Sequence, residues 1–193
     1  MKITKTKQSR IKDVDFSNLV FGTQFSDHML IAEYSNGSWS EPEIKPYGPL
    51  SFTPAMHTLH YGQAIFEGQK AYYMEDGKIG IFRPEANAKR LNHSARRMFM
   101  PEFPEDLFLE GIQALVDIDR EWVPKAENHS LYLRPFMFGS SEFVAARPSE
   151  KYIFCIICSP VGPYYSGDVK VKVEETFTRS ASGGVGSTKC AGN

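Results

Sequence analysis

The stretch Tyr152-Ile-Phe-Cys-Ile-Ile-Cys158 is a continuous apolar run with the length and composition of a buried β-strand. A second apolar stretch, Leu131 to Phe138, precedes it and is also predicted to be a strand. Cys155 and Cys158 form a Cys-x-x-Cys pair inside the run, but residues three apart in a strand point to opposite faces. We therefore predict that both cysteines pack in the core, because a thioredoxin-type pair needs a turn into a helix.

The sequence before this strand pair predicts two hairpins and three helices. The hairpin strands are 28–34 with 39–44, joined at Asn36-Gly37, and 69–74 with 78–83. The first helix is expected over 57–67, closed by Gly68, and the second over 84–98, with proline at its first position. A third helix is expected between Pro104 and Pro124, and its apolar face is Phe108, Ile112, Leu115 and Trp122. This mixture predicts an α+β fold.

Four segments are expected: a tail (1–20), a small domain (21–159), a linker (160–167) and the start of a larger domain (168–193). Pro160-Val-Gly-Pro163 and Ser166-Gly167 are typical of a linker. The tail is rich in lysine with no apolar run after it, so we expect it to be solvated and frayed. Val169 to Val173 alternates valine with lysine, which predicts a half-exposed strand.

Composition excludes several classes of protein. The chain has 193 residues, 41% of them hydrophobic, and a net charge of −1, which argues against disorder and gives no electrostatic reason to bind nucleic acid or anionic lipid. No run approaches the roughly 20 apolar residues that span a membrane. The three cysteines are an odd number, which favours a reducing, cytoplasmic location. His57 and His60 are the only histidines with ligand-like spacing, and we expect no metal site.

The chemistry is concentrated in Gly183-Gly-Val-Gly-Ser-Thr-Lys189-Cys-Ala-Gly-Asn193. Glycines allow close backbone approach to a ligand, and a desolvated lysine amine can act as a nucleophile. A phosphate-binding P-loop is excluded, because Lys189 is followed by Cys190 rather than by serine or threonine. From the residues alone, both a Schiff-base lysine and a structural glycine loop remain open.

Six sequence blocks occur in an order typical of one family. They are Phe21-Gly22-Thr23, Leu59-His60-Tyr61, Phe66-Glu67-Gly68, Phe82-Arg83-Pro84, Leu131-Tyr132-Leu133-Arg134-Pro135 and Gly183 to Asn193. On these blocks the chain resembles the branched-chain amino-acid aminotransferases, pyridoxal-phosphate enzymes of fold type IV. The resemblance covers the chain from about Phe21 onwards. It implies an amino transfer from L-leucine, L-isoleucine or L-valine to 2-oxoglutarate, giving glutamate and a branched-chain 2-oxo acid.

The resemblance also implies residue roles. Lys189 matches the catalytic lysine that forms the Schiff base with pyridoxal 5'-phosphate, and Arg90 matches the arginine that binds the cofactor phosphate. Arg134 matches the arginine near the distal carboxylate of glutamate. Further substrate-binding positions are Phe21, Tyr61, Phe66, Tyr132 and Tyr164, the last in a loop over the substrate. Val144 and Ala146, like Tyr61, match segments that reach the neighbouring subunit's site, since family members are homodimers.

One departure from the family concerns the end of the sequence. The family motif continues past Asn193, so we expect these residues to be part of a longer polypeptide and to be inactive in isolation. Two alternatives stay open. The first is another fold-type IV enzyme, a D-amino-acid aminotransferase or an aminodeoxychorismate lyase. The second is a non-catalytic dimerising fragment, against which the retained Lys189 argues.

Overall fold

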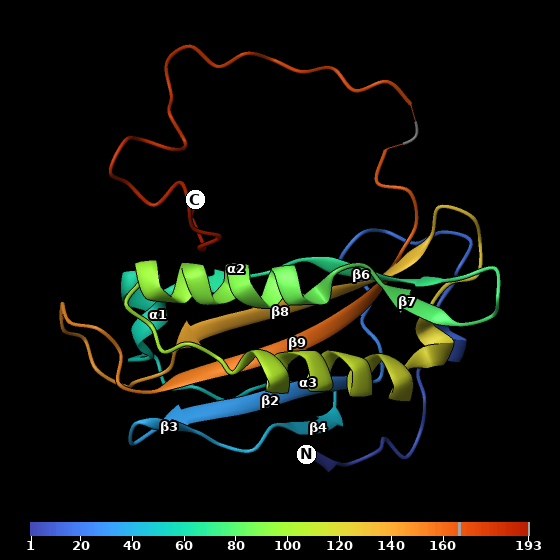
Figure 1. Cartoon of the computed structure of the whole chain (residues 1–193), viewed down its shortest axis with the longest axis horizontal. Coiled ribbons are helices and arrows are strands. Elements are labelled where there is room, and N and C mark those ends of the chain that lie inside the picture. The colour runs from blue at the N-terminus through green and yellow to red at the C-terminus, as the bar shows by residue number, and fades with distance from the viewer. Residues whose placement is uncertain (166, 193) are drawn as a thin grey trace.

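A nine-stranded mixed sheet forms the centre of the computed structural model, which describes residues 1–165 and 167–192. Ser166 of the expected linker and Asn193 of the glycine-rich segment lie outside the described residues. The strands are β1 (Lys2–Ile3), β2 (His28–Ser35), β3 (Ser38–Trp39), β4 (Glu43–Pro46), β5 (Ala64–Phe66), β6 (Gln69–Tyr73), β7 (Ile79–Ile81), β8 (Ser130–Gly139) and β9 (Tyr152–Val161). The main order across the sheet is β1-β4-β2-β9-β8-β6-β7, with β3 on β2 and β5 on β8 (Figure 1).

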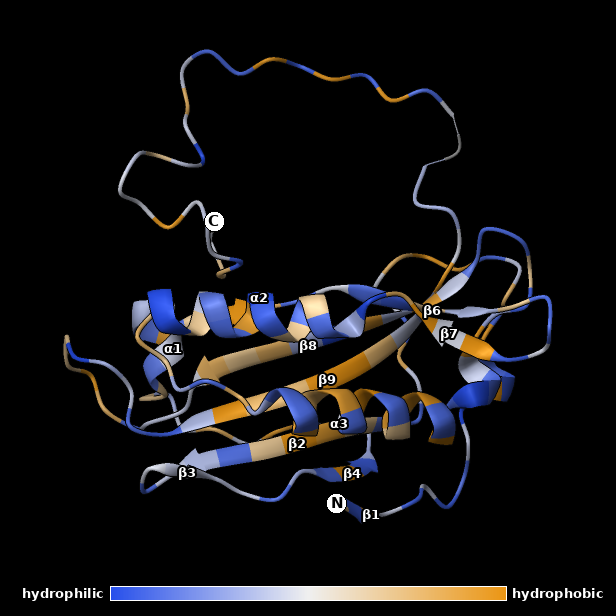
Figure 2. Ribbon diagram, in the orientation of Figure 1, coloured by the Kyte–Doolittle hydropathy of each residue, from blue (hydrophilic) through white to orange (hydrophobic). Residues whose placement is uncertain are grey.

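Two long helices cover one face of this sheet. The α-helices are α1 (His57–Tyr61), α2 (Pro84–Arg97) and α3 (Glu105–Ile118), and short 3-10 helices span Ile11–Asp13 and Arg120–Trp122. The two long helices α2 and α3 lie side by side over β8, β9 and β2 (Figure 1), and the strands beneath them are largely apolar (Figure 2). The expected α+β fold is confirmed. No helix within residues 1–165 and 167–192 has the length and apolar character needed to cross a membrane.

The second hairpin and the central strand pair are confirmed. The first hairpin is confirmed too, but its return strand, expected over 39–44, is divided into β3 and β4. β8 and β9 run antiparallel over ten paired positions, from Ser130 opposite Val161 to Gly139 opposite Tyr152. Asn36 and Gly37 have φ values of 53° and 83°, as a type I′ hairpin turn requires. Strand β9 continues through Val161, two positions into the segment 160–167 expected to be a linker.

The two cysteines of the Cys-x-x-Cys pair lie on opposite faces of β9, as predicted. Cys158 packs in the main core under α2 and α3, whereas Cys155 belongs to a smaller cluster on the other face. Both are free thiols. Burial raises the pKa of Cys155 to about 12 and that of Cys158 well above its usual value. These thiols therefore pack as small apolar groups.

Two helix predictions were wrong in extent. The first helix ends at Tyr61 instead of reaching residue 67, because Gly62 takes a left-handed conformation and Ala64–Phe66 pairs with β8 as a strand. The third helix ends at Ile118, so Trp122 lies in a 3-10 turn rather than on the face of the helix. In both cases tertiary pairing or packing overrides the local apolar pattern.

The strand predicted over Val169 to Val173 was also wrong. These residues have no strand conformation, and Val171 and Val173 are 85% and 79% exposed. The chain between residues 167 and 182 arches away from the sheet (Figure 1). An alternating pattern forms a strand only beside a hydrogen-bonding partner, and no described strand pairs with this segment.

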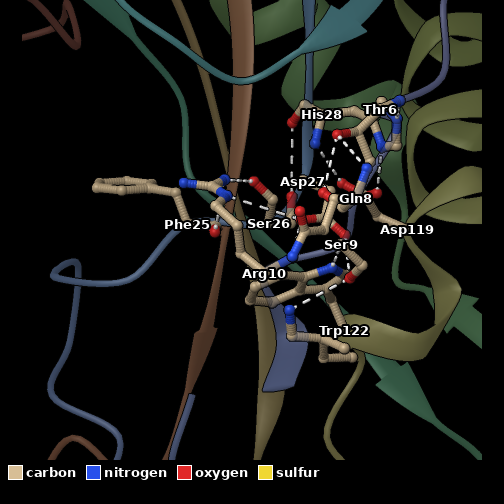
Figure 3. A network of polar contacts seen from close by, with 11 residues as sticks. Thr6, Gln8, Ser9, Arg10, Phe25, Ser26, Asp27, His28, Asp119 and Trp122 are labelled. Carbon is tan, nitrogen blue, oxygen red and sulfur yellow. Dashed lines mark hydrogen bonds and ion pairs between the residues drawn. The ribbon is translucent and has the colours of Figure 1, made fainter. Parts of the chain in front are cut away.

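The prediction of a solvated N-terminal tail was wrong for its first part. Strand β1 pairs in parallel with β4, at Lys2 opposite Glu43. Beyond it, three donors reach the nearly buried carboxylate of Asp27 at 2.5, 2.9 and 2.9 Å: the Ser9 hydroxyl, the Arg10 backbone N–H and the Trp122 indole N–H (Figure 3). The tail is held by polar contacts to residues far along the chain, which a local lysine-rich composition does not reveal.

A second contact beside Asp27 extends this network to α3. Nδ1 of the buried His28 lies 2.6 Å from a carboxylate oxygen of Asp119, and Nε2 of His28 accepts the Thr6 backbone N–H at 2.9 Å (Figure 3). The His28 backbone N–H donates to the other Asp119 oxygen at 3.0 Å. The network thus joins the tail, β2 and the turn after α3.

Candidate functional site

The lysine segment is attached to the edge of strand β5. The Phe66 N–H donates to the Lys189 carbonyl at 2.9 Å, and the Ala191 N–H donates to the Ala64 carbonyl at 2.9 Å. Ile65 and Cys190 form an antiparallel bridge between these bonds. Since β8 occupies the other edge of β5, the short strand is held between the lysine segment and the main sheet.

The side chain of Lys189 lies over an aromatic ring. Its ammonium nitrogen is 4.5 Å from the centroid of Phe66, a cation–π geometry. The residue is half-buried, and within the ranges 1–165 and 167–192 no ion pair joins it to a carboxylate. A lysine side chain that no carboxylate engages is a candidate nucleophile or base.

Arg90 on α2 binds a carboxylate that sequence reasoning did not assign. Nε and Nη2 of Arg90 each lie 2.7 Å from an oxygen of Glu67, which is completely buried at the end of β5. The Asn87 side chain adds a hydrogen bond to the same carboxylate at 2.8 Å. The hydrogen bonds that Arg90 donates to Glu67 raise the pKa of Arg90 above its usual value. Glu67 lies inside the sequence block Phe66-Glu67-Gly68. The block marked the position, but nothing in the sequence indicated that its carboxylate pairs with Arg90.

An aromatic and cationic cluster forms over the start of β8. The ring of Phe21 lies 5.0 Å from Tyr132 and 5.1 Å from Tyr164. Arg134 donates to the Tyr132 hydroxyl at 2.9 Å, and its guanidinium lies 4.6 Å from the Phe66 ring. Tyr132 and Arg134 therefore share one face of β8, as their spacing predicts. This cluster contributes to a cavity of about 250 Å³ between the Phe21 loop and the sheet.

Three predicted site residues do not join this cluster. Tyr61 ends α1 with 41% of its surface exposed and its ring 4.8 Å from His57. Val144 and Ala146 are exposed in the loop that follows β8, and His57 contacts this loop at the Phe143 ring, 5.3 Å away. These residues form a separate, exposed group at the opposite end of β8.

The described site thus combines three kinds of group. A half-buried amine and a partly exposed guanidinium flank the end of β5, and beside them lies an aromatic surface with a Tyr–Arg pair. Such an arrangement can bind a phosphorylated aldehyde through the amine and the guanidinium, and hold an apolar or carboxylate side chain on the aromatic surface. No group of three or more His, Cys, Asp or Glu side chains suited to a metal occurs in the part of the chain that the structure describes.

Comparison with known proteins finds relatives that are named branched-chain aminotransferases. The chain is 45% identical over 184 residues to branched-chain-amino-acid transaminase 1 of Bacillus subtilis (strain 168). The chain is homologous to branched-chain aminotransferases. It is also 41% identical over 195 residues to the branched-chain-amino-acid aminotransferase of Mycolicibacterium smegmatis. The alignments cover 93% and 98% of the chain but only 52% and 53% of the relatives, so it spans about half the length of the curated relatives it matches. No protein-family model matches the chain.

Solved structures share the fold. The branched-chain aminotransferase of the thermophilic archaeon Thermoproteus uzoniensis, solved with norvaline, superposes with a TM-score of 0.55 at 19% identity, over 70% of this chain and 41% of that one. An aminotransferase from Brucella abortus bound to pyridoxal phosphate gives 0.53 at 18% identity, over 84% and 53% of the two chains. At these identities the likeness establishes the fold alone. The family resemblance and the fold predicted from the sequence are confirmed.

Proposed function

We propose that this chain is part of a branched-chain aminotransferase, and that it is the part that carries the reactive lysine. The enzyme would move the amino group of L-leucine, L-isoleucine or L-valine to 2-oxoglutarate, with pyridoxal 5'-phosphate as cofactor. The observation that carries the proposal is the Lys189 amine, half-buried over Phe66 and free of any ion pair in residues 1–165 and 167–192. The proposal is also supported by the 45% identity between this chain and a branched-chain-amino-acid transaminase.

The residues of the site fit this cofactor. Pyridoxal phosphate supplies an aldehyde that bonds to amines and a ring that withdraws electrons from the substrate α-carbon. Lys189 provides the amine and would carry the proton to and from that α-carbon. Arg90 keeps 55% of its side-chain surface exposed while Nε and Nη2 bind Glu67, which leaves Nη1 for a phosphate oxygen.

The aromatic cluster fits both kinds of amino donor. Phe21, Phe66 and Tyr132 offer the apolar surface that a branched side chain needs, and burying such a side chain contributes roughly 1.5–3 kcal/mol. Arg134 and the Tyr132 hydroxyl form a joint polar anchor for the distal carboxylate of glutamate or 2-oxoglutarate. We propose that Tyr164, whose ring contacts Phe21, covers the substrate.

The exposed residues away from the aromatic cluster suggest how the enzyme assembles. We propose a homodimer in which Tyr61, Val144 and Ala146 reach the neighbour's site, because they are exposed and lie apart from the cluster around Arg134. Residues 160–167 would connect the small domain to the larger cofactor domain that begins at residue 168. A cytoplasmic enzyme agrees with three cysteines that form no disulfide among the described residues.

The decisive test is the mass of the purified full polypeptide that contains residues 1–193, with and without borohydride reduction in the presence of pyridoxal phosphate. We expect a pyridoxyl adduct that maps to Lys189 and is absent from Lys189→Arg. Amino transfer to 2-oxoglutarate is then compared for L-leucine and D-alanine. No adduct at Lys189 would refute the cofactor role, and a preference for D-alanine would favour another fold-type IV enzyme.

A further inference from the structure

One face of helix α2 touches both ends of the glycine-rich lysine loop. Arg90, Ser94 and Arg97 are spaced four and three residues apart, which places them on the same side of the helix. The hydroxyl of the completely buried Ser94 accepts the Lys189 backbone N–H at 3.0 Å. Nη2 of Arg97 donates to the carbonyls of Gly183 and Gly184, each at 3.1 Å.

These contacts hold a segment that has no regular secondary structure to define its path. Residues 183–187 are mostly exposed and carry no strand or helix, and Gly183 has a φ of +74° that few other residues adopt. Val185 packs against the main core, and the mostly exposed residues around it belong to the kind of loop that opens at a low free-energy cost. The Arg97 contact fixes where the loop begins, and the Ser94 contact fixes the backbone at the lysine itself.

We propose that Ser94 and Arg97 are positioning residues for Lys189. They tie its backbone to the helix that carries Arg90, so one rigid element sets the distance between the amine and the guanidinium. Neither residue needs to touch cofactor or substrate, because each acts through the loop. The assignment rests on the proposed function, in which Lys189 and Arg90 bind opposite ends of one cofactor.

The first test follows the loop without the cofactor, by hydrogen exchange in the full cofactor-free polypeptide. Ser94→Ala removes the acceptor of the Lys189 N–H, and Arg97→Gln removes the guanidinium that binds the two carbonyls. We expect exchange to become about three- to tenfold faster at the Lys189 amide in the first variant and over residues 183–189 in the second. Arg96→Gln is the matched control, because the neighbouring Arg96 pairs with Glu102 instead of the loop.

The second test measures whether a displaced loop weakens cofactor binding through Lys189. We expect the dissociation constant for pyridoxal phosphate to rise about three- to tenfold in both variants. The pH at which the visible absorbance of the bound cofactor changes should shift as well, which a loss of overall stability does not cause. Arg97→Lys keeps a cation that can donate to one carbonyl, so we expect it to recover part of the affinity.

The outcomes separate the two proposals. Unchanged exchange in both variants, or faster exchange with unchanged affinity and absorbance, would overturn the positioning role. If the variants loosen the loop but the unaltered polypeptide binds no pyridoxal phosphate, the proposed function falls and the positioning assignment falls with it. Faster exchange together with weaker binding, and neither change in Arg96→Gln, would support the assignment.

Discussion

Replacing Asp27 by asparagine tests the network that fastens the N-terminal tail. Asp27 is only 7% exposed, and its two oxygens accept hydrogen bonds from Ser9, Arg10 and Trp122. An amide of the same shape keeps one oxygen, so at least one N–H or O–H donor then faces an NH2 group. A hydrogen bond to a charged acceptor is worth about 1.5–3 kcal/mol, and the bonds that survive lose the assistance of the charge. We expect the free energy of unfolding to fall by about 3 kcal/mol.

Thermal unfolding monitored by circular dichroism measures this loss. For a domain of 150–250 residues, 1 kcal/mol corresponds to about 2–4 °C, so the midpoint should fall by about 6–12 °C. Asp117→Asn is the control, because Asp117 is 75% exposed and pairs with Arg120 on the surface. A midpoint for Asp27→Asn within about 1 °C of the unaltered protein would refute the reasoning, since the tail would then add no stability.

The pH dependence gives an independent check of the same site. Burial raises the pKa of Asp27, but hydrogen bonds from Arg10, Ser9 and Trp122 outweigh it and the net pKa lies below the usual value. A carboxyl with a lowered pKa in the folded state stabilises the protein above its unfolded-state pKa and loses that contribution as the pH falls through the folded value. The stability difference between the unaltered protein and Asp27→Asn should therefore shrink below about pH 4. A difference that stays constant to pH 2 would exclude this explanation.

Three further predictions concern the site and the core. Arg90→Met leaves the buried Glu67 carboxylate without its cation. A double-mutant cycle with Glu67→Gln, measured by urea unfolding of the cofactor-free polypeptide, should give a coupling energy of about 1–3 kcal/mol. Additive effects of the two substitutions would contradict the pairing. Tyr132→Phe removes the hydroxyl that Arg134 binds. The KM for 2-oxoglutarate should therefore rise about three- to tenfold, while the KM for L-leucine changes little. An equal change in both KM values would argue against the joint anchor. Cys155, with its raised pKa and deep burial, should resist iodoacetamide at pH 7.5 until the protein is unfolded with denaturant, and rapid labelling of the native protein would show that this face of the sheet opens.

Much of the sheet could be predicted because its strands carry their own pattern. Tyr152 to Cys158 is a continuous apolar run because both faces of β9 are buried, and the Asn36-Gly37 turn requires the positive φ values that these residues tolerate. By contrast, Val169 to Val173 has the right alternation and no partner, so the pattern alone was not enough. Local sequence specifies which face a strand would bury, whereas pairing decides whether the strand forms.

Only part of the candidate site could be predicted from the sequence. The spacing of Tyr132 and Arg134 predicts their shared face, but Arg90 carries no local signal that separates it from an ordinary surface charge on a helix. Glu67 was missed because a buried carboxylate is recognised by its partner, and that partner lies on another element. The contacts of Ser94 and Arg97 with the lysine loop join residues that no periodicity relates. Such features depend on tertiary proximity, which one sequence does not reveal.

The bridge between Ile65 and Cys190 also governs the order in which the protein can fold. Strand β5 must first be aligned on β8 before its free edge can accept the lysine segment, and closing so long a stretch of chain is entropically slow. Refolding should therefore produce a formed sheet well before the Lys189 amide becomes protected from exchange with solvent. The Lys189 side chain is then among the last groups to reach its place, after the core beneath it has excluded water.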